Sequence, residues 1–281
     1  MRQHDVDVGD GLLLHVTDNG AGPPLVLLHG FTGSTETWNP LVPHLAAVHR
    51  VIAVDLPGHG RSSAPSDPGR YALDWFAGDL VRVLDDLSVD RVALLGYSMG
   101  GRAALRFALA HVDRLAALIL ESTSPGIPDP KLRSERIVAD RMLADAIERD
   151  GIVAFVNRWE MLPLWESQEK LAGSVRQKLR EQRLTNTAIG LANSLRGAGA
   201  GVDQPVLDRL EGVQVPVLVV AGALDSRYIE HGRTMVGAIP NARMVVVPEA
   251  GHSVHVEQPE ALTEAALSFL RGLPSGGGRW L

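Results

Sequence analysis

The chain has 281 residues, of which 45% are hydrophobic and 21% charged, and its formal net charge is −6. This composition predicts a globular protein with a substantial core, and the acidic balance argues against a nucleic-acid partner. The absence of cysteine excludes disulfides, thiolate zinc sites and thiol nucleophiles. We find no signal-peptide pattern and no apolar run near the roughly 18 residues of a membrane span, so we expect a cytoplasmic protein without membrane insertion.

Short apolar runs recur along the chain and predict buried strands. These runs lie at residues 12–16, 25–28, 51–54, 92–95, 117–120, 217–220 and 242–247. Residues 73–87 instead place apolar side chains at helical spacing, with acidic residues on the other side. Continuous apolar strands separated by helices are typical of a parallel sheet covered on both faces. The predicted fold class is therefore α/β, with a large, open, mostly parallel sheet.

The alternation stops between about residues 122 and 210, where the pattern becomes helical and charged. We interpret this segment as a helical cap inserted into a core of residues 1–121 and 211–273, and residues 274–281 as a flexible tail. Residues 131–183 contain 11 basic and 9 acidic residues, against 16 and 24 in the remainder. This contrast fits either a solvated helical surface or basic groups that face an anionic substrate.

The most informative stretch is Gly96-Tyr97-Ser98-Met99-Gly100-Gly101-Arg102, which lies between the apolar run 92–95 and the helix-forming run 103–110. A strand, a sharp turn and a helix, with glycines on both sides of a serine, are typical of a nucleophile elbow. Glycines are needed because larger side chains would collide with the tightly turned backbone. The pattern is short, so its meaning depends on partners elsewhere in the chain.

Two later loops supply candidate partners for Ser98. Asp225 follows the strand at 217–220 and His252 follows the strand at 242–247, which places all three at the carboxyl edge of the predicted sheet. A serine hydroxyl becomes a base or nucleophile when a histidine takes its proton and a carboxylate fixes the histidine tautomer. Because the chain order also matches this architecture, the sequence predicts a catalytic triad of Ser98, Asp225 and His252.

Backbone donors for a developing oxyanion are predicted at two turns. The Met99 N–H follows the serine, and the Phe31 N–H lies in the turn after the strand at 25–28. None of the ten histidines lies at a spacing, with a second histidine and a carboxylate, that indicates a metal site. We therefore predict no metal.

The triad residues also have structural interpretations. Ser98 would suit any tight turn, His252 any loop, and Asp225 would cap the helix that follows it. Asp55, at an earlier strand end, competes for the role of the acid. Three further histidines are interpreted as packing or loop-structuring groups, namely His29, His59 and His255.

With these residues assembled, the chain resembles the α/β-hydrolase fold family over nearly its whole length. Within that family it resembles the 2-succinyl-6-hydroxy-2,4-cyclohexadiene-1-carboxylate synthases of menaquinone biosynthesis. The segments that carry the resemblance are 29–34, 55–60, 96–102, 120–126, 135–136, 159–160 and 190–197. The first two segments are common to many α/β-hydrolases, and the others are more specific.

The resemblance implies a lyase that eliminates pyruvate from 2-succinyl-5-enolpyruvyl-6-hydroxy-3-cyclohexene-1-carboxylate with no metal and no organic cofactor. In such an enzyme Ser98, made basic by His252 and Asp225, removes a ring proton. The implied partner is a small polycarboxylate substrate, and guanidinium groups bind carboxylates bidentately. The residues expected to bind that substrate are Tyr97, Arg102, Arg136, Trp159 and Arg227.

Several of these substrate-binding residues have structural alternatives. Arg102 would also fit a helix-surface ion pair, Arg136 a pair with Asp140 one turn later, and Trp159 the core of the cap. Arg227 stands where the family tends to have a lysine, which keeps the charge and changes its shape and reach.

The main alternative function is a carboxylesterase or related hydrolase, because the same triad and donors would serve acyl transfer with Ser98 as the nucleophile. A binding protein that kept the scaffold is a third possibility. Arginines that face the serine favour the lyase, since neutral esters need none. No oligomeric state is predicted.

Overall fold

The computed structural model describes residues 1–273, which form an eight-stranded sheet flanked by helices. The strands are β1 Arg2–Asp7, β2 Leu13–Asn19, β3 Pro24–Leu28, β4 Arg50–Val54, β5 Val92–Tyr97, β6 Leu115–Glu121, β7 Val217–Gly222 and β8 Ala242–Val247. The α-helices are α1 Val42–Leu45, α2 Leu73–Asp86, α3 Met99–Ala110, α4 Pro130–Trp159, α5 Gly173–Leu184, α6 Ala188–Ala198, α7 Ser226–Ala238, α8 Val254–Glu257 and α9 Pro259–Arg271. Short 3-10 helices are η1 Thr35–Trp38, η2 Pro68–Tyr71, η3 Val112–Arg114, η4 Pro163–Lys170 and η5 Leu207–Gly212. The predicted tail, residues 274–281, lies outside the described residues.

The sheet order is β1-β2-β4-β3-β5-β6-β7-β8, and all strand pairs from β4 to β8 are parallel. β1 and β2 join this sheet as an antiparallel edge. The predicted α/β class with a mostly parallel sheet is confirmed.

Two details at the antiparallel edge differ from the sequence prediction. β1 was not predicted, because it is an edge strand in which Val6 is the single buried residue. The strand predicted at 12–16 extends to Asn19, beyond the polar residue Asp18. This residue can lie inside the strand because its buried carboxylate pairs with Arg50 at 3.0 Å.

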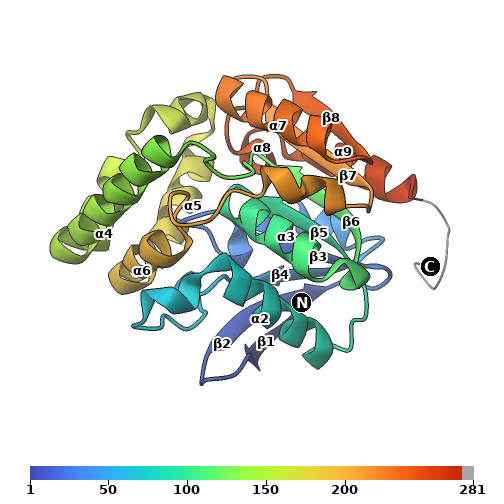
Figure 1. Cartoon of the computed structure of the whole chain (residues 1–281), viewed down its shortest axis with the longest axis horizontal. Coiled ribbons are helices and arrows are strands. Elements are labelled where there is room, and N and C mark those ends of the chain that lie inside the picture. Colours follow the sequence, from blue (N-terminus) through green and yellow to red (C-terminus); the bar gives the residue numbers. More distant parts are fainter. Residues whose placement is uncertain (274–281) are drawn as a thin grey trace.

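Side chains alternate between the two faces of the sheet. In β3, Val26 and Leu28 face a core shared with α2, α3 and α7, whereas Leu25 and Leu27 face a core shared with α1 and α9. Figure 1 shows α2 and α3 lying in front of the sheet. The buried strands are apolar on both faces because helices cover both. No helix within residues 1–273 is long and apolar enough to cross a bilayer.

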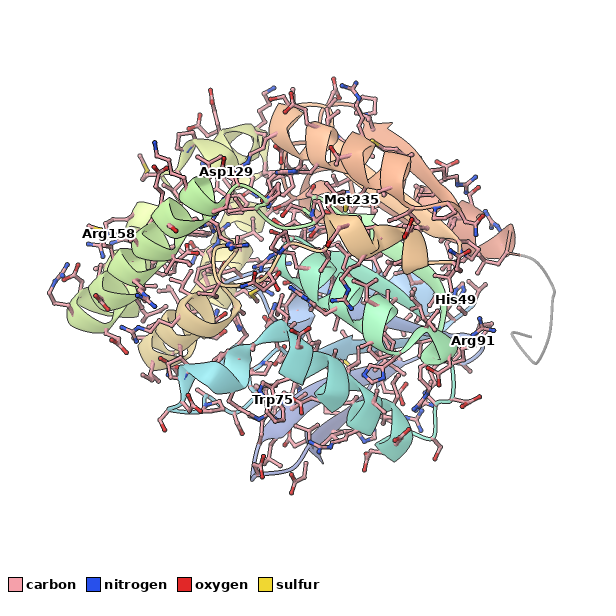
Figure 2. The ribbon with its side chains drawn as sticks, viewed as in Figure 1. His49, Trp75, Arg91, Asp129, Arg158 and Met235 are labelled. Atoms are coloured by element: carbon pink, nitrogen blue, oxygen red, sulfur yellow. The ribbon has the colours of Figure 1, made fainter. Side chains whose placement is uncertain are left out.

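Helices α4, α5 and α6 gather beside one end of the core (Figure 1). α4 begins where the Asp129 carboxylate accepts the Lys131 N–H at 2.8 Å, and it is kinked at Gly151, whose φ is 81°. Figure 2 labels Asp129, which precedes the first residue of α4, and Arg158, which lies in the part of the helix after the kink. α4 and α6 share a separate apolar cluster that includes Phe155 and Leu191. The boundaries 122–210 of the cap stay a prediction.

The close approach of α3 to β3 predicts a steep cost for a methyl group at Gly100. A Cβ there would collide with the backbone carbonyls of Leu28 and His29. We expect Gly100→Ala to lower the free energy of unfolding by about 1–3 kcal/mol, as measured by urea titration. The control is Gly78→Ala, in the interior of α2, where a Cβ meets no atom within 4 Å. This change should raise stability by about 0.5–1 kcal/mol, and equal effects of the two changes would contradict the prediction.

Candidate active site

Ser98 occupies the sharp turn between β5 and α3. Its φ of 51° and ψ of −109° are unusual for a residue with a side chain, and such conformations cost about 1–3 kcal/mol. The turn persists because the Ser98 N–H donates to the Glu121 carbonyl at 2.9 Å, while the Ser98 carbonyl accepts the Thr123 hydroxyl at 2.7 Å. The predicted elbow is therefore held by bonds to β6 and to the loop that follows it.

The structure brings Ser98, His252 and Asp225 together in hydrogen-bonding order. His252 Nδ1 lies 2.8 Å from Asp225 Oδ2, and His252 Nε2 lies 3.2 Å from Ser98 Oγ. Because an ionised carboxylate can only accept, Nδ1 carries the proton and Nε2 is left to accept the Ser98 hydroxyl. This arrangement can draw a proton from Ser98.

Asp225 also caps α7, since its Oδ1 accepts the Tyr228 N–H at 3.3 Å. Its catalytic and structural interpretations therefore coexist. The competing acid, Asp55, accepts the backbone N–H groups of Thr35 and Arg61 and orders the loops that contain them. His252 is paired with Asp225, not with Asp55.

The two predicted oxyanion donors lie in the turn after Ser98 and in the turn after β3. Met99 is the first residue of α3, and the first N–H groups of a helix have no partner within it. In the other turn, the Gly33 N–H donates to the Gly30 carbonyl at 3.0 Å, and this bond does not use the Phe31 N–H. A Cβ at Gly30 would lie 3.3 Å from the Ser98 Cβ, so the two turns are in close contact. The oxyanion role of both donors stays a prediction.

Ser98 and His252 open onto a cavity of about 300 Å³ between the core and the cap. Every residue that the sequence nominated for the site lines this cavity, namely Phe31, Tyr97, Ser98, Met99, Arg102, Arg136, Trp159, Asp225, Arg227 and His252. Core loops and cap helices, far apart in the chain, thus contribute to one chamber.

Arg102 reaches this cavity from α3 and is buried. Its guanidinium donates to Asp203 at 3.0 Å and to the Ala198 carbonyl at 2.8 Å. Arg106, one turn later, binds the same Asp203 carboxylate at 2.7 Å. The alternative of an ion pair on the helix surface is therefore wrong in its location, because the pair lies inside the molecule and ties α3 to the segment after α6.

Arg136 and Arg227 differ in how far they are already paired. Arg136 Nε donates to Asp140 at 2.8 Å, as the spacing of four residues predicted, and this bond leaves its two terminal nitrogens uncommitted. Arg227 is exposed at the start of α7 and forms no ion pair among residues 1–273. Arg227 is therefore the cation most available to a ligand carboxylate.

Tyr228 was not nominated from the sequence, yet it lines the cavity with its ring 4.4 Å from that of His252. Burial raises the pKa of Tyr228, and the positive charges of Arg227, Arg102 and Arg136 act in the opposite direction. All three guanidinium groups are thus close enough to influence one hydroxyl. The cavity lining carries three arginines against two aspartates, Asp140 and Asp225, although the chain as a whole is acidic.

Tyr97 and Trp159 contribute ring surfaces to the cavity. The Tyr97 hydroxyl lies 2.9 Å from Ser253 Oγ, and burial holds the pKa of this phenol well above its usual value. Trp159 packs with its ring centre 5.4 Å from those of both Phe31 and Phe155. Trp159 is thus part of the cap core and of the cavity wall at once.

The sequence did not indicate two further cap residues, Trp165, which lines the cavity, and Arg183, which lies over the Trp165 ring. The Trp165 ring lies 5.8 Å from the His252 ring, and the Arg183 guanidinium lies 5.3 Å from the Trp165 ring centre. Burial lowers the pKa of Arg183, which also pairs with Glu160 at 3.1 Å. No spacing signal links these cap residues to a loop of the core, so sequence alone could not find them.

The three histidines interpreted from the sequence as packing or loop-structuring groups are buried, namely His29, His59 and His255. Burial lowers the pKa of His29 to about 4, and its Nε2 accepts the Leu56 N–H at 3.0 Å. Burial also lowers the pKa of His59 to about 3, and His255 is packed against Glu121 at 2.7 Å. Within residues 1–273, no group of three or more histidine and acidic side chains is placed to hold a metal ion.

A serine elbow, a histidine and an acid at the carboxyl edge of a mostly parallel sheet define an enzyme of the α/β-hydrolase class. The family model for the alpha/beta hydrolase fold matches residues 23–259. The chain therefore belongs to the alpha/beta hydrolase family.

Within this family, the chain is similar to a putative 2-succinyl-6-hydroxy-2,4-cyclohexadiene-1-carboxylate synthase from Bacillus subtilis (strain 168). The two are 42% identical over 271 residues, which cover 96% of this chain and 98% of the relative. The solved structure of MenH from S. aureus has a TM-score of 0.87 at 34% identity and covers 92% of this chain and 97% of its own. A malate-bound esterase from Thermogutta terrifontis has a TM-score of 0.85 at 31% identity, covering 97% and 99%. The resemblance inferred from the motifs is confirmed.

The shared carboxylate between Arg102 and Arg106 predicts a large stability effect. Asp203→Asn would leave the buried Arg102 guanidinium without its counter-charge and would leave Arg106 with only the exposed Asp74 carboxylate at 3.5 Å, and such a loss costs about 3–5 kcal/mol. We expect urea unfolding to report a loss of this size. The control is Asp85→Asn, whose side chain is 61% exposed and pairs with Arg114 at 2.8 Å, where the loss should stay below about 1 kcal/mol. Similar losses of unfolding free energy in both variants would contradict the prediction that the buried ion pairs of Asp203 stabilise the fold.

Proposed function

We propose that the protein is a lyase that eliminates pyruvate from 2-succinyl-5-enolpyruvyl-6-hydroxy-3-cyclohexene-1-carboxylate and gives 2-succinyl-6-hydroxy-2,4-cyclohexadiene-1-carboxylate, as a cytoplasmic step of menaquinone biosynthesis. The observation that carries the proposal is a serine–histidine–aspartate chain opening onto a cavity lined by Arg102, Arg136 and Arg227. A substrate with several carboxylates needs such a chamber. The 42% identity to the Bacillus relative supports the same assignment.

In this reaction Ser98 acts as a base. His252, oriented by Asp225, takes the Ser98 proton as the serine oxygen removes a proton from the ring. The electrons of the broken C–H bond form a ring double bond, the C–O bond to the enolpyruvyl group breaks, and the leaving group becomes pyruvate after protonation. Negative charge that develops on the substrate would face the N–H groups of Met99 and Phe31.

Ester hydrolysis is the second candidate, because the same groups would serve Ser98 as a nucleophile. The similarity to the Thermogutta esterase, at 31% identity, supports ester hydrolysis as this second candidate. The fold does not separate the two functions, and the charges of the cavity favour the lyase.

The deciding assay follows pyruvate release from the pathway intermediate beside cleavage of p-nitrophenyl acetate and butyrate by one preparation. We expect a far higher kcat/KM for pyruvate release. Ser98→Ala should abolish both activities, because both need the serine oxygen. Rapid ester cleavage without pyruvate would overturn the lyase in favour of a hydrolase, and a Ser98→Ala protein with normal turnover would contradict both.

Arg227 offers the clearest test of carboxylate binding, since it is exposed and lacks an ion pair among the described residues. Losing a charge-assisted hydrogen bond of about 1.5–3 kcal/mol should raise the KM of Arg227→Gln about 10–100-fold, with kcat changed much less. The control is Arg233→Gln, on the same helix and also exposed, which should retain the wild-type KM. Equal KM values for both variants would argue against a substrate role for Arg227.

A further inference from the structure

The loop that bears His252 is held by two carboxylates that take no part in the triad. Glu257, the last residue of α8, accepts the Gly251 N–H at 2.7 Å and the Ser253 N–H at 3.2 Å. Gly251 and Ser253 are the chain neighbours of His252. One carboxylate therefore fixes the backbone on both sides of the imidazole.

The Glu257 side chain has no other polar role within residues 1–273. Its hydrogen bonds are those to the two N–H groups, and it forms no ion pair there. Bonds from backbone N–H groups to an ionised carboxylate are about twice as strong as neutral ones. Gly251 is also tightly enclosed, since a Cβ there would collide with the Ser167 side chain and lie 3.1 Å from the Glu257 carboxylate. The loop therefore has little room to shift.

The second carboxylate belongs to Glu121, the last residue of β6. Its buried Oε1 accepts the His255 N–H at 3.0 Å and lies 2.7 Å from His255 Nδ1. The backbone carbonyl of the same residue accepts the Ser98 N–H at 2.9 Å. Glu121 thus joins the turn of the serine to the loop of the histidine, and the distance between Ser98 and His252 is set from outside the triad.

We propose that Glu257 is a positioning residue for proton transfer between Ser98 and His252, with Glu121 and His255 as the second anchor of the same loop. The proposal rests on the triad assigned under the proposed function. It holds for a lyase and for an esterase alike, because both need His252 within hydrogen-bond reach of Ser98. Releasing one anchor displaces the imidazole and slows the proton transfer. The substrate-binding arginines keep their places, so KM is preserved.

The test replaces Glu257 with glutamine, which puts an NH₂ group where one N–H needs an acceptor. We expect the rate of Ser98 sulfonylation by phenylmethanesulfonyl fluoride to fall about 10–100-fold. The kcat for pyruvate release should fall by a similar factor, with KM within about twofold of wild type. Glu257→Asp keeps the acceptor on a shorter side chain and should restore part of the rate. Glu264→Gln makes the same charge change at an exposed position of α9 and should match wild type.

A second readout is the downfield proton NMR signal of His252 Nδ1–H, which should broaden or vanish in Glu257→Gln at a temperature where the variant is folded. A folded Glu257→Gln protein with the wild-type sulfonylation rate would overturn the proposal, as would equal losses in Glu257→Gln and Glu264→Gln. If Glu257→Gln does not fold, Glu257→Asp decides by the same criterion. Slower sulfonylation of Glu257→Gln in an enzyme that releases no pyruvate would support the positioning role while contradicting the proposed lyase.

Discussion

The backbone conformation of Ser98 is the constraint on which the site depends. Ser98 keeps a φ of 51°, which is unusual for a residue with a side chain, because hydrogen bonds to neighbouring elements hold its backbone in this conformation. Glycines allow the required contacts, since a Cβ at Gly96 would collide with Gly100 and a Cβ at Gly101 with Thr123. The hydroxyl is consequently fixed above the sheet before any substrate arrives.

The parallel sheet determines what can meet that hydroxyl. β5, β6 and β7 are neighbours, and their carboxyl ends deliver Ser98, Glu121 and Asp225 to a single edge. The next strand leads into the loop of His252. The cap then closes this edge with aromatic rings and Arg136. The residues of the triad therefore come from loops of the core. Two of the cavity arginines, Arg102 and Arg227, also come from core helices, whereas the inserted helices add Arg136 and aromatic rings.

The sequence predicted the parts of this arrangement that local patterns encode. Apolar runs located the parallel strands, and the glycines around Ser98 together with the positions of Asp225 and His252 located the triad. Contacts between distant positions lack such a pattern. The pairs that Asp203 forms with Arg102 and Arg106 could not be predicted, because the residues next to Asp203 in the sequence form no pattern that indicates an ion pair.

The triad alone does not decide between proton removal and attack on a carbonyl, because both begin with transfer of the Ser98 proton to His252. What differs is the group that the cavity holds against the serine oxygen. Arg102 is largely committed to Asp203, Arg136 is partly committed to Asp140, and Arg227 is free of ion pairs among the described residues. The three guanidinium groups thus differ in how far they are already paired within the protein. This difference suits a substrate whose carboxylates are bound at different depths, with the exposed Arg227 contacting the substrate before the buried Arg102. The cavity arginines therefore bear on which substrate is bound, whereas the same triad would serve either reaction.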